Sequence, residues 1–198
     1  MKPKLKIKIG FFSILLSLTI IISDPYYFLA LLFAVSLHEI GHVVGARLAK
    51  ISLRELKLGI FGAGLHTESS LISYKKEIIL SLFGPLANFI SIALFTLIAP
   101  TALRGNVFCD NFLLSSLSLG VLNLLPIESF DGGRILSAVL SFFTSPSTAS
   151  KVICAVSFII IFLLWTLSVY ILIRASSSIS LFVFCAYLFS KLFIKDAL

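Results

Sequence analysis

Long apolar runs, each close to the length needed to cross a bilayer, constrain this chain more than any other feature. A membrane-spanning helix takes about 20 apolar residues, and the 198-residue chain is 59% hydrophobic with only 13% charged residues. Soluble domains carry roughly a quarter charged residues. The sequence therefore predicts an integral membrane protein.

The apolar runs are separated by short polar segments and predict six spans, at 9–23, 27–49, 77–99, 111–126, 151–173 and 178–194. Asp24-Pro25 separates the first two, because proline disfavours helix in the residue before it. The predicted fold class is an all-α membrane protein of about six transmembrane helices. We expect a single polytopic domain over residues 1–198.

The distribution of lysine and arginine predicts the orientation, because cytosolic segments carry an excess of both. With a cytosolic N-terminus, only Arg104 and Arg174 fall outside. The other fourteen fall inside, at Lys2, Lys4, Lys6, Lys8, Arg47, Lys50, Arg54, Lys57, Lys75, Lys76, Arg134, Lys151, Lys191 and Lys195. Both termini are therefore predicted to be cytosolic, and Cys109 to lie near the outer surface. Basic residues that flank spans also argue against nucleic acid as a partner.

Residues 49–76 form the one sizeable segment outside the predicted spans. Residues 53–58 alternate partly between apolar and polar, and Gly59, Gly62 and Gly64 follow. This pattern predicts a short β-like segment with tight turns between the second and third helices. A cytosolic loop without regular structure is the alternative.

The second span carries a metal-binding pattern. His38 and His42 are four residues apart, so they project from one helical face about one turn apart and can share a metal ion. Glu39 lies beside the same face, where it can accept and return a proton. Ionisable groups inside a membrane helix are costly and usually persist for function. The pattern predicts a metal site with a general base beside it.

A catalytic zinc site has three protein ligands and leaves a fourth position for water. The candidates for the third ligand are Asp131, Glu128, His66, Asp24 and Asp110. The last two fall on the outer side by the charge distribution. Asp131 is favoured, because Pro126 interrupts the fourth span and Gly132-Gly133 lets the backbone turn sharply. A helix cap is the alternative role for Asp131.

Three signatures resemble the site-2 protease family of intramembrane zinc metalloproteases. They are His38-Glu39-x-Gly41-His42, Gly84-Pro85-x-x-Asn88, and Asn123-x-x-Pro126 with Asp131-Gly132-Gly133. The resemblance is strongest to the compact bacterial branch that includes the stage IV sporulation protease, which acts on a sigma-factor precursor.

The resemblance implies a role for each matching residue. It implies that Zn²⁺ is bound by His38, His42 and Asp131, and that Glu39 is the general base. It also implies that Asn88 helps to position the substrate. The remaining signature residues are assigned to the same substrate-positioning group: Gly84, Pro85, Asn123 and Pro126. Helix packing is the alternative role for Asn88, since an intramembrane asparagine seeks a partner.

The sequence departs from the family just before the aspartate. The family commonly has Pro-Leu there, whereas this chain has Ser129-Phe130, preceded by an additional carboxylate at Glu128. We expect this stretch to be less rigid as a result. Some relatives also carry a PDZ or CBS domain, and we expect neither in this chain.

The expected function is hydrolysis of a peptide bond in a membrane or membrane-associated protein, near the cytosolic face of a bacterial cell membrane. By the resemblance, the cleavage would activate a transcription or sigma factor, and a regulatory membrane protein is a further candidate partner. Because a helical substrate must unwind before cleavage, we expect residues 56–65 to hold it as an edge strand beside the site.

Three alternatives remain open from the residues alone. One is another HExxH protease that uses a downstream glutamate ligand, for which no Glu-x-x-x-Asp pairing is found on a later helix. A second is a metal-binding membrane transporter, which would want internal repeats. The third is a non-catalytic pseudoprotease that holds membrane proteins.

Overall fold

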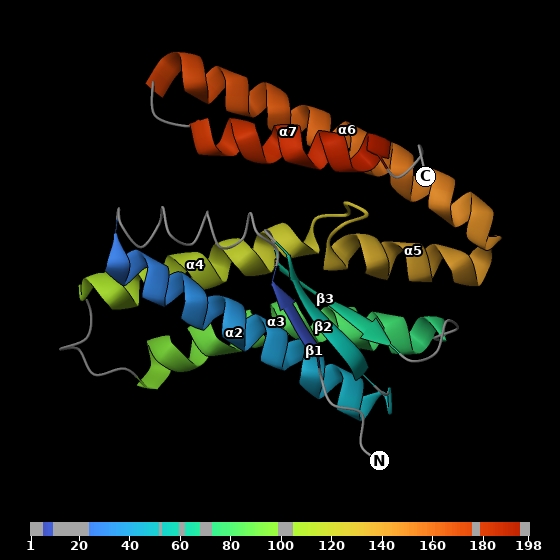
Figure 1. The fold of residues 1–198 in the computed structure, drawn as a ribbon, viewed down its shortest axis with the longest axis horizontal. Coiled ribbons are helices and arrows are strands. Elements are labelled where there is room, and N and C mark those ends of the chain that lie inside the picture. Colours follow the sequence, from blue (N-terminus) through green and yellow to red (C-terminus); the bar gives the residue numbers. More distant parts are fainter. Residues whose placement is uncertain are drawn as a thin grey trace. The chain divides into compact units, whose positions relative to one another are not determined.

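A computed structural model describes residues 6–9, 24–51, 53–59, 62–67, 73–98, 105–175 and 179–194. The chain separates into two compact units, Met1–Leu124 and Leu125–Leu198. The prediction of a single domain over residues 1–198 is not tested by this division and stays a prediction. The two units are described in turn below (Figure 1).

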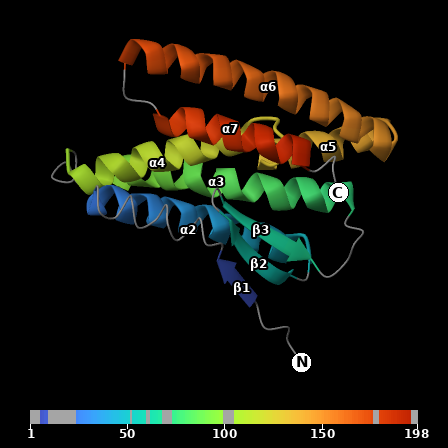
Figure 2. The same ribbon diagram turned by 45° about the horizontal axis from the view of Figure 1, so that its top comes forward.

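Three long helices form the body of the N-terminal unit: α2 (Pro25–Leu48), α3 (Tyr74–Ile98) and α4 (Val107–Leu124). Each of the three packs against the other two, and they lie side by side in both views (Figures 1 and 2). Their buried contacts include a cluster of Ala30, Ala34 and Phe112. Most of their large apolar side chains face outward, as expected where lipid replaces water as the solvent.

Helix α2 has a defined beginning and end. The Asp24 carboxylate caps its start by accepting a hydrogen bond from the Tyr27 N–H at 2.9 Å, and Pro25 occupies the first turn. Lys50 ends the helix in the left-handed conformation, with φ of 52°. The Ile51 N–H then donates to the Ala46 carbonyl at 2.8 Å, which is a Schellman arrangement. Both ends of α2, the helix that carries the two histidines, are therefore determined by residues next to them in the sequence.

The close approach of α2 to α3 depends on glycine. A Cβ atom at Gly41 would collide with the Phe83 carbonyl, and one at Gly45 would lie 2.9 Å from the Phe83 Cβ. Small residues let membrane helices bring their backbones together. This contact places the two histidines of α2 directly against α3.

A three-stranded sheet also belongs to this unit, in the order β1-β2-β3. It comprises β1 (Lys6–Ile9), β2 (Leu53–Gly59) and β3 (Gly62–Thr67). β1 is parallel to β2, and β2 is antiparallel to β3 with Gly59 opposite Gly62. Residues 56–65, expected to form one edge strand, instead contain parts of two strands. β2 is central, and β3 lies at an edge of the described sheet.

The C-terminal unit contains α5 (Asp131–Phe143), α6 (Pro146–Ala175) and α7 (Ile179–Ile194). α5 packs on α6, and α6 packs on α7, beside which it runs in both views (Figures 1 and 2). One buried hydrophobic cluster of this unit contains Ile127, Phe130, Ile161 and Leu188. Two of these residues come from the turn before α5, which ties that turn to the α6–α7 pair.

Four described helices are long and apolar enough to span a membrane: α2, α3, α4 and α6. They correspond to the predicted spans 27–49, 77–99, 111–126 and 151–173. The sixth predicted span, 178–194, contains the shorter α7, so a sixth crossing is not established. Residues 10–23 of the first predicted span lie outside the described residues. The chain is an integral membrane protein.

Candidate metal centre

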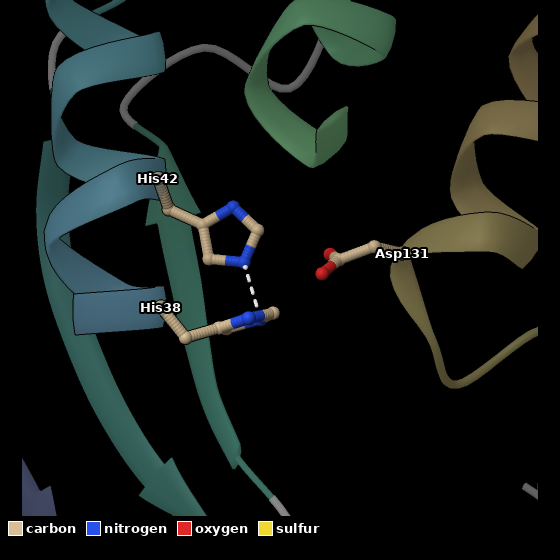
Figure 3. Close-up of side chains that lie close together, drawn as sticks. All are labelled: His38, His42 and Asp131. Carbon is tan, nitrogen blue, oxygen red and sulfur yellow. Dashed lines mark hydrogen bonds between the residues drawn. The ribbon is translucent and has the colours of Figure 1, made fainter. Parts of the chain in front are cut away.

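His38 and His42 lie on one face of α2, with both side chains buried (Figure 3). Their ring centroids are 4.8 Å apart and the rings are nearly perpendicular, at 86°. The two Nε2 atoms approach to 3.2 Å, along the dashed line in Figure 3. The i, i+4 spacing therefore brings the same atom of each ring to one point.

The opposite nitrogen of each ring contacts α3. The His42 Nδ1 lies 2.8 Å from the Leu80 carbonyl oxygen, and the His38 Nδ1 lies 3.1 Å from the Asn88 Oδ1. A carbonyl oxygen only accepts, so each Nδ1 must carry the proton. The Asn88 amide nitrogen donates to the Ala34 carbonyl at 3.4 Å, which fixes the orientation of the amide. α3 thus selects the same tautomer for both histidines.

This tautomer decides what the pair can bind. A neutral imidazole has one N–H, so with the proton on Nδ1 both facing Nε2 atoms present lone pairs. Two zinc–nitrogen bonds of about 2.0–2.1 Å in a tetrahedral site hold their nitrogens roughly 3.3 Å apart. Histidine ligands also usually donate their other N–H to a carbonyl or carboxylate. The geometry fits two ligands to one cation.

Gly84 provides the space in front of the two rings. A Cβ atom at this position would collide with the Nε2 and Cε1 atoms of His42 and with the Nε2 of His38. Any larger residue would therefore occupy the place toward which both lone pairs point. The neighbouring Pro85 is also buried within α3, where it cannot donate a hydrogen bond to the Ser81 carbonyl.

Glu39 is the third polar residue of the motif and is 9% exposed. It lies next to His38 in the chain and three residues before His42, so it flanks the face that carries the two rings. A carboxylate there can exchange protons with a water molecule at the metal position.

Asp131 is the first residue of α5, in the C-terminal unit, and is buried at 6% exposure (Figure 3). The residue in the N-cap position is Phe130, and it makes no side-chain capping bond. The buried Gly132 and Gly133 follow, and a Cβ atom at Gly133 would collide with the Ile127 carbonyl. Glycine is needed there because the preceding turn folds back onto the first turn of α5.

The other candidate ligands have different surroundings. Asp24 caps α2, and Asp110 is exposed in the first turn of α4. Glu128 is partly buried in the turn before α5. His66 belongs to β3, but its side chain lies outside the described residues. Among the described side chains, the carboxylates of Asp24, Asp110 and Glu128 are not grouped with the histidine pair.

Two further signature residues lie near the end of α4. The Asn123 amide nitrogen donates to the Leu119 carbonyl of its own helix at 3.0 Å. Pro126 follows the last residue of α4 by two positions and lies in the turn toward α5. The break predicted at Pro126 is therefore present, although the substrate-positioning roles of both residues stay predictions.

Comparisons with known proteins agree with this arrangement. The model of peptidase family M50 matches residues 106–167, which include Asp131. A zinc metalloprotease of Methanocaldococcus jannaschii is 30% identical over 138 residues, which cover 66% of this chain and 40% of that protein. The chain is therefore similar to peptidase family M50 over part of its length. It spans about two fifths of the length of that relative.

A solved structure shows the same fold. The site-2 protease from Methanocaldococcus jannaschii superimposes with a TM-score of 0.65 at 22% sequence identity. The match covers 94% of this chain and 88% of that one. The match to the family M50 model and the similarity in fold to a site-2 protease agree with the family resemblance of the sequence motifs. The comparisons do not single out the sporulation branch.

Sequence reasoning missed the two groups that hold the histidine rings. The Leu80 acceptor is a backbone carbonyl, so its side chain carries no signal. Asn88 was singled out, but as a substrate-positioning residue, whereas both of its amide atoms contact protein groups and the side chain is fully buried. An asparagine on a spanning helix was the only available signal.

Proposed function

We propose that this chain is the catalytic core of an intramembrane zinc metalloprotease. The observation that carries the proposal is the histidine pair, whose two Nε2 atoms converge to 3.2 Å while α3 holds both Nδ1 atoms. The match to the model of peptidase family M50 and the similarity to a zinc metalloprotease support the same conclusion.

Asp131 is proposed as the third zinc ligand, with His38 and His42. It is a buried carboxylate within the segment that matches the family model, and it follows a helix break. Buried carboxylates are paired or bind metals. Three protein ligands leave a fourth position for water, which is the arrangement of catalytic zinc sites.

Glu39 is proposed as the general base. Zinc, when bound, lowers the pKa of water and polarises the scissile carbonyl. The Glu39 carboxylate then takes a proton from the attacking water and delivers it to the leaving amine. Apolar surroundings limit the access of bulk water, and on the orientation predicted from the basic residues water would enter from the cytosolic side.

The proposed substrates are membrane or membrane-associated proteins, cut near a helix-breaking residue toward the cytosolic side. Backbone groups of a membrane helix are already paired, so the substrate must unwind and then needs new partners. A strand edge supplies them by β-augmentation. Of the hairpin strands, β3 has the available edge in the described sheet, so we propose that β3 holds the substrate.

The biological role is proposed from the family resemblance alone. Release of a transcription or sigma factor, with a regulatory membrane protein as a second partner, fits the compact branch that the motifs resemble. The membrane fractions of cells with the wild type and of cells with Glu39→Gln can be compared by their protein content. A protein that stays in the membrane only in the Glu39→Gln cells is the candidate substrate.

The roles at the metal site give the first prediction. We expect Glu39→Gln to abolish hydrolysis while zinc stays bound, because this residue handles protons. His38→Ala, His42→Ala and Asp131→Ala should each lower the zinc content as well. Metal analysis of the purified variants and cleavage of a reporter substrate measure both properties.

Four results would contradict parts of this proposal. Full zinc occupancy in Asp131→Ala removes it from the ligand set, and zinc loss in His66→Ala makes His66 the third ligand. Reporter cleavage by Glu39→Gln at the wild-type rate would exclude Glu39 as the base. A wild type that binds zinc but cleaves no membrane substrate would favour the pseudoprotease alternative.

A further inference from the structure

The turn that presents Asp131 is fixed by its own backbone. The Ile127 N–H donates to the Leu125 carbonyl at 2.7 Å, and the Phe130 N–H donates to the Ile127 carbonyl at 2.8 Å. The Arg134 N–H in turn donates to the Phe130 carbonyl at 3.1 Å. This turn is expected from the sequence to be less rigid, because it lacks the family's proline. The structure shows what else holds it.

Ser157, halfway along α6, is the external support of the turn. Its hydroxyl oxygen accepts a hydrogen bond from the Glu128 N–H at 2.8 Å, and the side chain is fully buried. Its own proton is donated to the Ile153 carbonyl at 2.6 Å. The Ser157 hydroxyl therefore donates its proton within α6, and its oxygen lone pair accepts the hydrogen bond from the turn. A buried N–H without such an acceptor is costly.

Apolar contacts support the turn at the residues on either side of this bond. Ile127 and Phe130 are buried in one cluster with Ile161, which lies one helical turn beyond Ser157 on α6. The Phe130 ring also stacks with Phe184 of α7, at 6.4 Å between centroids and 12° between planes. The same face of α6 thus provides both the hydrogen bond to the turn and apolar contacts with it.

We propose that Ser157 is a positioning residue for the metal centre, acting through the turn that carries Asp131. In this chain the Ser157 hydroxyl and the apolar contacts of Phe130 supply the rigidity that a proline supplies in relatives. The inference rests on the proposed function, since it takes Asp131 as a zinc ligand. The α6–α7 pair then serves as the support of a ligand as well as a membrane anchor.

A matched pair of substitutions tests the hydroxyl. Ser157→Thr keeps the acceptor, whereas Ser157→Val has nearly the same shape without it. We expect Thr to bind zinc like the wild type and Val to bind it about 10–100-fold more weakly, the usual effect of losing a group that supports a ligand. Zinc affinity is measured on the full chain in detergent by competition with a chelator. The absorption spectrum of the Co²⁺-loaded protein reports the ligand geometry independently of activity.

Two controls separate the possible failures. Ser168→Ala removes the other fully buried serine of α6, which donates to the Trp165 carbonyl, and should leave zinc affinity unchanged. If Asp131→Asn weakens zinc binding but Ser157→Val does not, the role of Ser157 is overturned and the proposed function stands. If Asp131→Asn binds zinc like the wild type, the positioning role of Ser157 is overturned together with the assignment of Asp131 as a ligand. Ser157→Ala, which is smaller, replaces the valine variant if that one fails to fold.

Discussion

The histidine pair is set by contacts that reach across two helices rather than along one. His38 and His42 share a face because they are one turn apart, but their rotation and tautomer come from the Asn88 side chain and the Leu80 carbonyl of α3. Partners that hold a ligand in this way are commonly needed for metal affinity. Substitutions in α3 should therefore change the metal site although the ligand residues themselves are unchanged.

Asn88 provides the clearest case. We expect Asn88→Ala to lower zinc affinity by about 10–100-fold, because the His38 Nδ1–H loses its acceptor. When zinc is saturating, the KM for a membrane substrate should change little. Zinc competition assays and cleavage kinetics at fixed free zinc measure the two effects.

Asn123→Ala is the matched control for that substitution, since the Asn123 amide donates within its own helix. It should leave zinc affinity unchanged. A raised KM with full zinc affinity in Asn88→Ala would instead support the substrate-positioning role that the family resemblance implies.

Gly84 gives a prediction of the opposite kind, in which an added atom rather than a lost one disturbs the site. We expect Gly84→Ala to fold, because the ends of the two histidine side chains can yield to the new methyl group. The displaced Nε2 atoms should then lose zinc, and cleavage should fall by about 100-fold or more. Metal content and thermal unfolding of the purified variant are the measurements.

Gly45→Ala should show the reverse pattern. Its methyl group would press on the Phe83 side chain and lie 3.2 Å from the Ile79 carbonyl, away from both rings. Thermal stability should fall while zinc remains bound. Equal zinc content in Gly84→Ala and Gly45→Ala would show that the metal position does not depend on the space left by Gly84.

Among the elements, the β2–β3 hairpin has the most direct link to substrate. Gly59 and Gly62 are opposite each other with two residues between them, and in a two-residue hairpin the flanking residues form a hydrogen-bonded pair. Pairing alternates from there along the strands. The N–H groups of Ala63 and Leu65 are therefore expected to point away from β2, toward the available edge of β3.

Proline at these two positions tests the edge. Ala63→Pro and Leu65→Pro each remove one outward N–H and should spare the β2–β3 pairing, because proline is tolerated at such edge positions. We expect normal zinc content and cleavage slowed by about 10-fold or more, for the loss of a backbone bond to substrate. Zinc analysis and cleavage rates decide the outcome.

Gly64→Pro is the companion variant, since its N–H is expected to face β2 and its loss should disrupt the hairpin itself. Wild-type cleavage by both Ala63→Pro and Leu65→Pro would rule out presentation of the substrate by β3. Ile60 and Phe61, which lie between the two strands in the sequence, are outside the described residues.

The sequence predicts long helices well because a run of apolar residues has few alternatives in a bilayer. The predicted spans 77–99 and 151–173 begin within a few residues of α3 and α6. Contacts between distant residues are harder to predict. The Ser157–Glu128 bond joins positions 29 residues apart, and nothing in an isolated serine indicates which N–H it accepts from. Likewise, the position of β3 at the end of the described sheet depends on which strands assemble around it.

At the scale of the whole molecule, the open question is which compartment the site faces. Fourteen of sixteen basic residues predict cytosolic termini and a cytosolic loop between α2 and α3. Cys109 stays predicted to lie near the outer membrane surface, but its side chain is only 7% exposed, so it is a poor target for a labelling reagent. Ser73 and Val107 are exposed and lie at opposite ends of the helix bundle of the N-terminal unit.

Single cysteines at these positions test the orientation. In a variant without the native cysteines, Val107→Cys should react with a membrane-impermeant thiol reagent in intact cells. Ser73→Cys should react only after lysis, because the α2–α3 loop is predicted to be cytosolic. Labelling at position 73 without lysis would reverse the orientation and place the catalytic water in the other compartment.

The division of the chain between Leu124 and Leu125 has a mechanical consequence. The turn that presents Asp131 is held by residues that follow this division, namely Ser157 and the buried cluster of Ile127, Phe130, Ile161 and Leu188. A change in α6 or α7 would therefore displace the Asp131 carboxylate without altering the contacts that α3 makes with the two histidines.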